Sequence, residues 1–189
     1  MKFLLTTLNA KYIHLNLAIR SISAFCRNLS PEICEYTIND NIDNIIASLH
    51  SKKADVIAFS CYIWNIEKVL YISQWLKKVN PNLIINLGGH EVSHDSKELL
   101  KENPWIDFII RGEGEKPCYE LFEALYNRRF VDKIPSITYR EEDKILENPL
   151  GEAGSLNDYP FAYDESIRDF KGKIVYYESS RGCPYCCSY

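Results

Sequence analysis

The stretch Asp55-Val56-Ile57-Ala58-Phe59-Ser60-Cys61-Tyr62 decides the fold, because it holds an apolar run without the alternation of a half-exposed strand. Continuous apolar strands are typical of parallel sheets that are covered on both faces. Further strands are predicted on either side of this one, at residues 2–8, 32–38, 83–87 and 107–111. From the three-to-four-residue spacing of apolar positions, helices are predicted at residues 15–27, 44–51, 66–79, 95–101 and 116–127. This alternation predicts an α/β fold with a doubly wound, flavodoxin- or Rossmann-like sheet of five parallel strands.

The rest of the chain has a different pattern. Residues 136–146 are predicted to form a β-hairpin with a charged turn, and residues 149–161, rich in Gly, Pro, Asn and Asp, a linker. Residues 173–178 are predicted as a new strand that leads into a cysteine-rich loop. We therefore expect an α/β domain, a hairpin with its linker, and the start of a further domain, at residues 1–130, 131–172 and 173–189.

The composition disfavours several classes of protein. The net charge of −4 is mild and basic residues form no stripe, which disfavours nucleic-acid binding. No apolar run approaches the ~20 residues of a membrane-spanning helix. The seven cysteines are odd in number and no secretory signal opens the chain, so a disulfide framework is not expected. We expect the protein in the reducing cytoplasm, with Cys26, Cys34, Cys61 and Cys118 as small buried apolar residues.

Three cysteines lie within five positions near the end of the sequence, at Cys183, Cys186 and Cys187. Thiolates grouped on one short loop bind soft metals or iron–sulfur clusters, because a single turn directs several sulfurs at one centre. A zinc site with Cys183 and Cys186 as a C-x2-C pair is an alternative, although such a site needs a second pair or histidines. Free thiols are the other alternative.

Glycines follow two of the predicted strands, in Gly88-Gly89 and in Gly112-Glu113-Gly114. Ligands of open parallel sheets bind beyond the carboxyl ends of the strands, and residues without a Cβ let a ligand approach the backbone closely. The first strand is not followed by G-x-G-x-x-G, so the dinucleotide fingerprint is absent, and the sequence has no P-loop. Plain strand-to-helix turns would also explain these glycines.

The cysteine loop resembles that of radical S-adenosylmethionine enzymes. Ser180-Arg181-Gly182-Cys183-Pro184 is followed by Cys187, and a cysteine directly after Tyr189 would complete C-x3-C-x2-C. The resemblance implies that Cys183 and Cys187 bind a 4Fe–4S cluster, that Cys186 does not, and that the open iron chelates S-adenosylmethionine. It also implies that the 189 residues are the front part of a longer enzyme.

The preceding residues resemble the cobalamin-binding domain that stands ahead of many radical S-adenosylmethionine domains. The matching features are the strand ending in Ser60, the Leu87-Gly88-Gly89-His90 turn, the run 107–115, and Pro160-Phe161 before the cysteine loop. In that family the nucleotide tail of cobalamin lies along the sheet, and the corrin ring lies across the strand ends. The resemblance implies cobalamin contacts from Ser60, Tyr62, Gly88, Gly89, His90, Gly112 and Glu113.

One motif of cobalt-ligating cobalamin domains is missing. The loop after the first strand reads Asn9-Ala10-Lys11-Tyr12-Ile13-His14, which does not meet D-x-H-x-x-G. We therefore interpret His14 as a residue at the start of a helix rather than a cobalt ligand, and His94 as a solvent-facing residue. His90, beside two glycines, is the histidine predicted to contact a ligand.

The resemblance implies the amino-terminal part of a cobalamin-dependent radical S-adenosylmethionine enzyme. In such enzymes the cluster reduces the sulfonium, a 5′-deoxyadenosyl radical takes hydrogen from an unreactive C–H bond, and methylcobalamin can supply a methyl group. We expect a small-molecule or peptide substrate and a reductant protein as partners, and no activity from these 189 residues alone. Two other hypotheses stay open: a non-enzymatic corrinoid carrier or sensor, and a flavodoxin-like nucleotide-binding module with a zinc tail.

Overall fold

The computed structural model describes residues 1–152, 154–163 and 170–181. Its strands form one sheet in the order β2-β1-β3-β4-β5-β6-β7. The strands are β1 (Phe3–Asn9), β2 (Glu32–Thr37), β3 (Val56–Ser60), β4 (Ile84–Gly88), β5 (Phe108–Ile110), β6 (Ile137–Glu141) and β7 (Lys144–Glu147). The first five pair in parallel, in the 2-1-3-4-5 order of flavodoxin-like folds, which confirms the predicted fold class.

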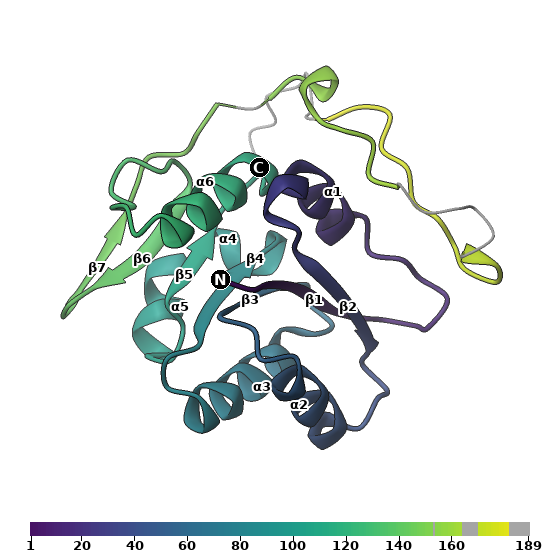
Figure 1. Ribbon diagram of the computed structural model, residues 1–189, viewed down its shortest axis with the longest axis horizontal. Helices are drawn as coiled ribbons and strands as arrows, with labels where there is room; N and C mark the ends of the chain where they lie inside the picture. Colours follow the sequence, from purple (N-terminus) through teal and green to yellow (C-terminus); the bar gives the residue numbers. More distant parts are fainter. Residues whose placement is uncertain (153, 164–169, 182–189) are drawn as a thin grey trace.

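Helices cover both faces of the sheet (Figure 1). They are α1 (Leu17–Phe25), α2 (Ile42–Ser51), α3 (Ile66–Val79), α4 (His90–Ser93), α5 (Ser96–Glu102) and α6 (Glu115–Tyr126), with 3-10 turns at Arg27–Leu29 and Leu156–Asp158. α1 and α6 lie on one face, and α2 and α3 lie on the other (Figure 1). Val92 of α4 and Leu100 of α5 belong to the core on the α2–α3 side. The sheet therefore separates two cores.

β3 is the buried centre of the sheet, as its apolar run predicts. All five of its residues are buried, and the strand pairs with β1 on one side and with β4 on the other. Ile57 and Phe59 belong to the core beside α2 and α3, whereas Val56 and Ala58 belong to the core beside α1 and α6. Because alternate residues of a strand face opposite sides, one short strand joins both cores.

Two asparagines set helix starts that differ from the predicted ones. Asn16 Oδ1 accepts a hydrogen bond of 3.0 Å from the backbone N–H of Ile19, so α1 begins at Leu17 instead of residue 15. Asn41 Oδ1 accepts one of 3.1 Å from Asn44 N–H, so α2 begins directly after Asn41. Such side chains satisfy the first N–H groups of a helix, which have no partner within the helix itself.

The predicted hairpin is present and extends the sheet. β6 pairs antiparallel with β5, with Ile137 opposite Ile110, and β7 pairs antiparallel with β6. The hairpin therefore covers the edge of β5 that the parallel strands leave open. The boundaries after residues 130 and 172 stay predictions.

The strand predicted at residues 173–178 is wrong. Within the described residues this segment makes a single parallel bridge, between Ile174 and His14. Ile174 N–H donates to Ile13 O at 2.7 Å, and Ile174 O accepts from Leu15 N–H at 3.3 Å. The neighbour is a loop that turns into α1 rather than a strand, so the ladder ends after one bridge.

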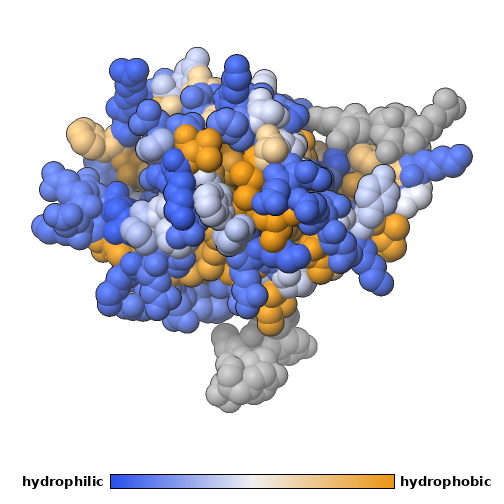
Figure 2. All heavy atoms as spheres, turned by 90° about the horizontal axis from the view of Figure 1, so that it is seen from below, coloured by the Kyte–Doolittle hydropathy of each residue, from blue (hydrophilic) through white to orange (hydrophobic). Residues whose placement is uncertain are grey.

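The surface on the α2–α3 side is mostly hydrophilic, with separate apolar patches (Figure 2). Trp75 of α3 is one of its exposed aromatic residues, and Lys78 Nζ lies 4.5 Å from the centroid of its indole ring. No helix in the described part of the chain is long and apolar enough to cross a membrane.

Candidate functional site

The carboxyl ends of β3, β4 and β5 meet at one level of the sheet. The register places Ser60 beside Gly88, and Gly88 beside Ile110. A cavity of about 770 Å³ lies at this level, between the sheet, α1 and the start of α6. Ligand cavities in proteins measure about 300–1,000 Å³, so this one has room for a cofactor or for part of a large one.

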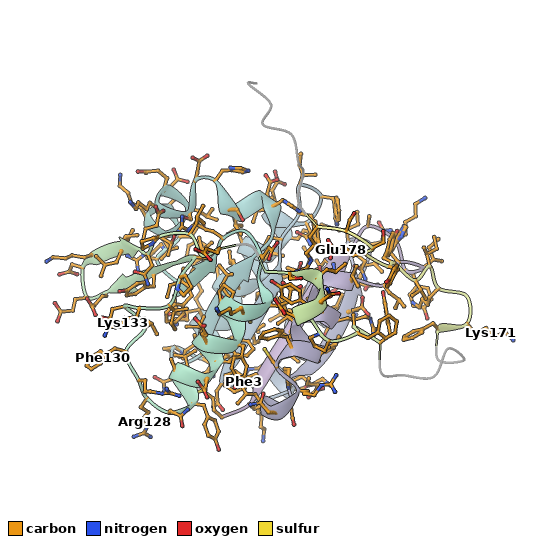
Figure 3. The ribbon with its side chains drawn as sticks, turned by 90° about the horizontal axis from the view of Figure 1, so that it is seen from above. Phe3, Arg128, Phe130, Lys133, Lys171 and Glu178 are labelled. Atoms are coloured by element: carbon orange, nitrogen blue, oxygen red, sulfur yellow. The ribbon has the colours of Figure 1, made fainter. Side chains whose placement is uncertain are left out.

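All seven residues predicted as cofactor contacts line this cavity: Ser60, Tyr62, Gly88, Gly89, His90, Gly112 and Glu113. They come from the loops or strand ends at β3, β4 and β5, which the parallel register brings together. Residues 177–181 line the same cavity, and Figure 3 shows Glu178 of this segment beside α1 and α6. That these residues touch a ligand stays a prediction.

Small and polar side chains form the floor of the cavity. Ser60 and Gly88 lie at the strand ends, and Ala58 and Asn86 lie two residues further in along their strands. Asn86 is 2% exposed, and its Oδ1 has no hydrogen-bond partner among the residues that the structure describes. A buried polar atom without a partner costs about 1–3 kcal/mol of stability, so this acceptor suits a ligand. Asn86 is not among the contacts predicted from the sequence, although it is the lone polar residue in the apolar run 83–87.

Glycine is needed at position 89 for the conformation of the backbone there, and not to leave room for a ligand. Its φ of 113° favours glycine, and a Cβ there would lie 2.3 Å from the carbonyl oxygen of Cys61. Cys61 N–H also donates to Gly88 O at 2.7 Å, which draws the two loops together. At Gly88 the nearest atom to an added Cβ would be the carbonyl oxygen of Ile110 at 3.8 Å, an ordinary contact. Gly88 is therefore the better position for a side chain that fills the cavity.

The loop after β3 carries a stacked aromatic pair at the cavity. The rings of Tyr62 and Trp64 lie 4.5 Å apart at an angle of 4°, and Tyr62 Oη accepts from Asn16 Nδ2 at 3.0 Å. Asn65 Oδ1 accepts from Tyr62 N–H at 2.8 Å, while Asn65 Nδ2 donates to Ser60 O at 3.1 Å. Asn65 directly precedes α3, which begins at residue 66 as predicted, but its side chain fixes this loop instead of capping the helix.

Arg181 fastens the segment 177–181 beside the cavity. Arg181 Nη2 donates to Glu115 Oε1 at 2.5 Å, and Arg181 Nε donates to Glu178 Oε2 at 2.7 Å. Its guanidinium also lies over the ring of Tyr159, 4.3 Å from the centroid. Burial alone lowers the pKa of Arg181, but the bonds to Glu115 and Glu178 raise it above its ordinary value.

The carboxylate of Glu113 is bound by other residues of the protein. Its Oε2 accepts from Tyr159 Oη at 2.8 Å and from the backbone N–H of Gly154 at 3.1 Å, and it lies 4.0 Å from Arg181 Nη1. The pKa of Tyr159 is raised to about 12, mainly by burial and next by this hydrogen bond to Glu113. Glu113 thus lines the cavity while its carboxylate holds residues of the predicted linker.

The three histidines named by the sequence analysis lie in different settings. His90 is exposed, begins α4 and lines the cavity, and His94 is exposed as predicted. The placement of His14 at a helix start is wrong, because Asn16 caps α1 two residues later. His14 Nδ1 instead lies 2.5 Å from the hydroxyl of Tyr176, next to the bridge with Ile174.

The cysteine loop, with Cys183, Cys186 and Cys187, lies outside the described residues. Within residues 1–152, 154–163 and 170–181, no three His, Cys, Asp or Glu side chains form a group that could hold a metal ion. The cluster ligands therefore stay a prediction.

The single cysteines behave largely as small apolar residues. Cys26, Cys61 and Cys118 are buried, and Cys34 is half-buried. Burial raises the pKa of Cys61 to about 12 and raises that of Cys118 well above its ordinary value. Because the thiolate is the metal ligand and the nucleophile, a raised pKa makes the thiols of Cys61 and Cys118 poorly suited to either role.

Comparisons with known proteins agree with this geometry. The family model described as B12 binding domain matches residues 4–122, more than half of the chain. The anaerobic magnesium-protoporphyrin IX monomethyl ester cyclase of Synechocystis sp. is 34% identical in an alignment 130 residues long, which covers 64% of this chain and 26% of that protein. The cobalamin-dependent radical SAM methyltransferase TokK of Streptomyces tokunonensis is 28% identical in an alignment 146 residues long, which covers 71% of this chain and 21% of TokK. The chain thus spans about a quarter or less of the length of these relatives.

Two solved structures share the fold. The cobalamin-dependent S-adenosylmethionine radical enzyme OxsB, with aqua-cobalamin and S-adenosylmethionine bound, matches with a TM-score of 0.66 at 20% identity, over 80% of this chain and 23% of OxsB. The radical S-adenosylmethionine methyltransferase TsrM from Kitasatospora setae, with cobalamin and a 4Fe–4S cluster bound, matches with a TM-score of 0.64 at 14% identity, over 82% of this chain and 30% of TsrM. The chain therefore belongs to the B12 binding domain family, and its relatives include cobalamin-dependent radical S-adenosylmethionine proteins, as the sequence predicted.

Proposed function

We propose that this chain binds cobalamin in the cavity beside α1 and α6, as the amino-terminal part of a radical S-adenosylmethionine enzyme. The observation that carries the proposal is the cavity itself, because it gathers the predicted contacts at the strand ends of a B12 binding domain. The residues of the floor would hold the nucleotide tail of the cofactor, and the loops at the strand ends would hold the corrin ring.

The residues of the cavity fit such a ligand. Gly88 has no side chain, and Ala58 and Ser60 have short ones, so the floor leaves room along the sheet. Leu5 of β1 and Ile22 of α1 provide apolar contacts for an aromatic base. The unpartnered acceptor of Asn86 adds a polar point of recognition within this apolar surface.

The protein's part is to bind and orient the cofactor and to exclude water. Cobalamin, when bound, supplies the methyl-transfer chemistry. Tyr62, which stacks on Trp64, borders the site at the end of β3, and residues 177–181 form a second border of the site. Arg181 holds this second border in place through Glu115 and Glu178.

The remaining parts of the proposal concern the whole protein. Cys183 and Cys187 bind a 4Fe–4S cluster together with a third cysteine beyond Tyr189, and Cys186 stays free. The cluster and S-adenosylmethionine serve radical chemistry on a small-molecule or peptide substrate, and methyl transfer to an unactivated carbon is the reaction we favour. A reductant protein in the cytoplasm delivers the electron.

Equilibrium dialysis against hydroxocobalamin tests the first part. The purified 189-residue protein is expected to take up one cobalamin per chain. A folded protein that takes up none contradicts the proposal, and stoichiometric flavin or zinc in its place favours the nucleotide-binding module.

The cluster is tested by anaerobic reconstitution of an extended protein, which continues past Tyr189 and includes the third cysteine. Iron is counted chemically, and the reduced cluster is observed by electron paramagnetic resonance. We expect Cys183→Ala to lose the cluster and Cys186→Ala to keep it; the opposite pattern shows that the ligands are wrongly assigned. Cobalamin uptake without iron in the extended protein favours the carrier or sensor.

A further inference from the structure

Asn86 is a buried amide inside the cavity. It belongs to β4, it is 2% exposed, and its Oδ1 has no hydrogen-bond partner in the part of the chain that the structure describes. Its neighbours Ile85 and Leu87 belong to the core on the α2–α3 side. Asn86 therefore faces the α1–α6 side, where it lines the cavity.

We propose that Asn86 is a specificity-determining contact: it hydrogen-bonds the nucleotide base of the bound cobamide and selects adenine over dimethylbenzimidazole. This inference rests on the proposed function, because it assumes that a cobamide occupies the cavity.

The position of Asn86 determines which part of the ligand it meets. Asn86 is paired with Ala58, and both lie two residues before the pair of Ser60 and Gly88 at the strand ends. Two residues of a strand span about 6–7 Å, so Asn86 lies that much deeper in the cavity than the strand ends. Of the two parts of a cobamide, the broad corrin ring and the slender nucleotide, the nucleotide is the one that reaches this depth.

The chemistry around Asn86 favours a flat base with one polar edge. Leu5, Ala58 and Ile22 line the same cavity and offer apolar contacts to the faces of a ring. An amide side chain pairs bidentately with the amino group and the adjacent ring nitrogen of adenine, because it carries a donor and an acceptor side by side. Dimethylbenzimidazole carries two methyl groups on its outer edge, and these offer the amide neither a donor nor an acceptor.

The test compares two cobamides that differ in the base. The 189-residue protein is dialysed against cobalamin and against adeninylcobamide, and both dissociation constants are measured. The unaltered protein is expected to bind adeninylcobamide at least about tenfold more tightly, the discrimination that one bidentate pair gives. Asn86→Leu is expected to bind the two cobamides equally. Asn82→Leu is the matched control, because Asn82 is exposed just before β4, outside the cavity, and this variant should keep the preference.

Thermal unfolding of the ligand-free variants checks that they fold. Asn86→Leu is expected to unfold at or above the temperature of the unaltered protein, because the exchange removes an unpartnered polar atom from the interior. Equal binding of both cobamides by the unaltered protein overturns the inference, and so does a preference that survives in Asn86→Leu. An unaltered protein that binds neither cobamide contradicts the proposed function as well.

Discussion

Arg181 and Glu115 form an ion pair at the edge of the cavity, with 2.5 Å between Nη2 and Oε1 across a sequence separation of 66 residues. Glu115 is the first residue of α6 and is 5% exposed. The pair holds residues 177–181 against α6, while Ile174 holds the residues before them against the loop that precedes α1. Two attachments therefore flank the part of the chain that lines the cavity.

Glu115→Gln is predicted to loosen this segment. The exchange removes one of the charges that Arg181 pairs with, the one on α6. A hydrogen bond to a charged group contributes about 1.5–3 kcal/mol, so cleavage is expected to accelerate about tenfold or more. Chymotrypsin cutting after Tyr177, which is 72% exposed, is followed by mass spectrometry under native conditions. Glu123→Gln is the control, because Glu123 lies on the same helix and forms an exposed ion pair with Arg129, which follows the helix. Equal cleavage rates in all three proteins contradict this role of the pair.

Gly88→Leu is predicted to abolish cobalamin uptake while leaving the fold intact. A Cβ at Gly88 makes only ordinary contacts, so the added side chain extends into the cavity without forcing the backbone. Equilibrium dialysis measures the uptake, and circular dichroism checks the fold. Ala47→Leu adds the same side-chain type on the exposed side of α2, across the sheet, and should bind normally. Undiminished uptake by Gly88→Leu would place the ligand elsewhere.

The fold could be predicted because its signals are local. The apolar run of β3 identifies a doubly buried strand without knowledge of its neighbours, and the apolar runs of β4 and β5 likewise identify strands. The starts of α1 and α2 differ from the predicted ones, since Asn16 and Asn41 define them through single side-chain hydrogen bonds. Residues 173–178 have the composition of a strand, but their neighbour is a loop, and composition does not report the neighbour.

Gly89→Ala is predicted to destabilise the protein more than Gly112→Ala does. Both residues have a positive φ, which costs alanine about 1–2 kcal/mol. Gly112 has nothing within 4 Å of an added Cβ, whereas at Gly89 that Cβ would lie 2.3 Å from Cys61 O. Urea denaturation is expected to show a loss of about 1 kcal/mol for Gly112→Ala and at least about 2 kcal/mol for Gly89→Ala. If both variants lose the same amount of stability, the loops at Cys61 and Gly89 move apart without cost to make room for the added Cβ.

Tyr159→Phe is predicted to make the free energy of unfolding depend less steeply on pH in the alkaline range. Burial, and then the bond to Glu113, raise the pKa of Tyr159 from 10.0 to about 12. The unfolded phenol ionises first, so the stabilisation is complete below about pH 10 and is lost as the pH rises towards 12. The free energy of unfolding, measured from pH 9 to pH 12, should therefore fall more steeply in the unaltered protein than in Tyr159→Phe. Tyr126→Phe, at an exposed tyrosine, should follow the unaltered protein, and identical slopes in all three would refute the raised pKa.

The candidate site was predictable only in part, for a physical reason. Its glycines and Ser60 lie at strand ends, and parallel strands bring such ends together, so position in the sequence was sufficient. Asn86 lies inside a strand, and its lack of a partner becomes visible only when its surroundings are known. The pairing of Arg181 with Glu115 joins residues that are 66 positions apart in the sequence, and no local pattern encodes such a contact.

A crystal structure of the chain grown with hydroxocobalamin tests the cobalamin site most directly. We predict density for the nucleotide between α1, α6 and the floor formed by Ala58, Asn86 and Gly88, with the corrin ring beyond the ends of β3 and β4. Cobalamin bound on the α2–α3 side, or an empty cavity in a crystal with cobalamin bound elsewhere, would contradict the assignment.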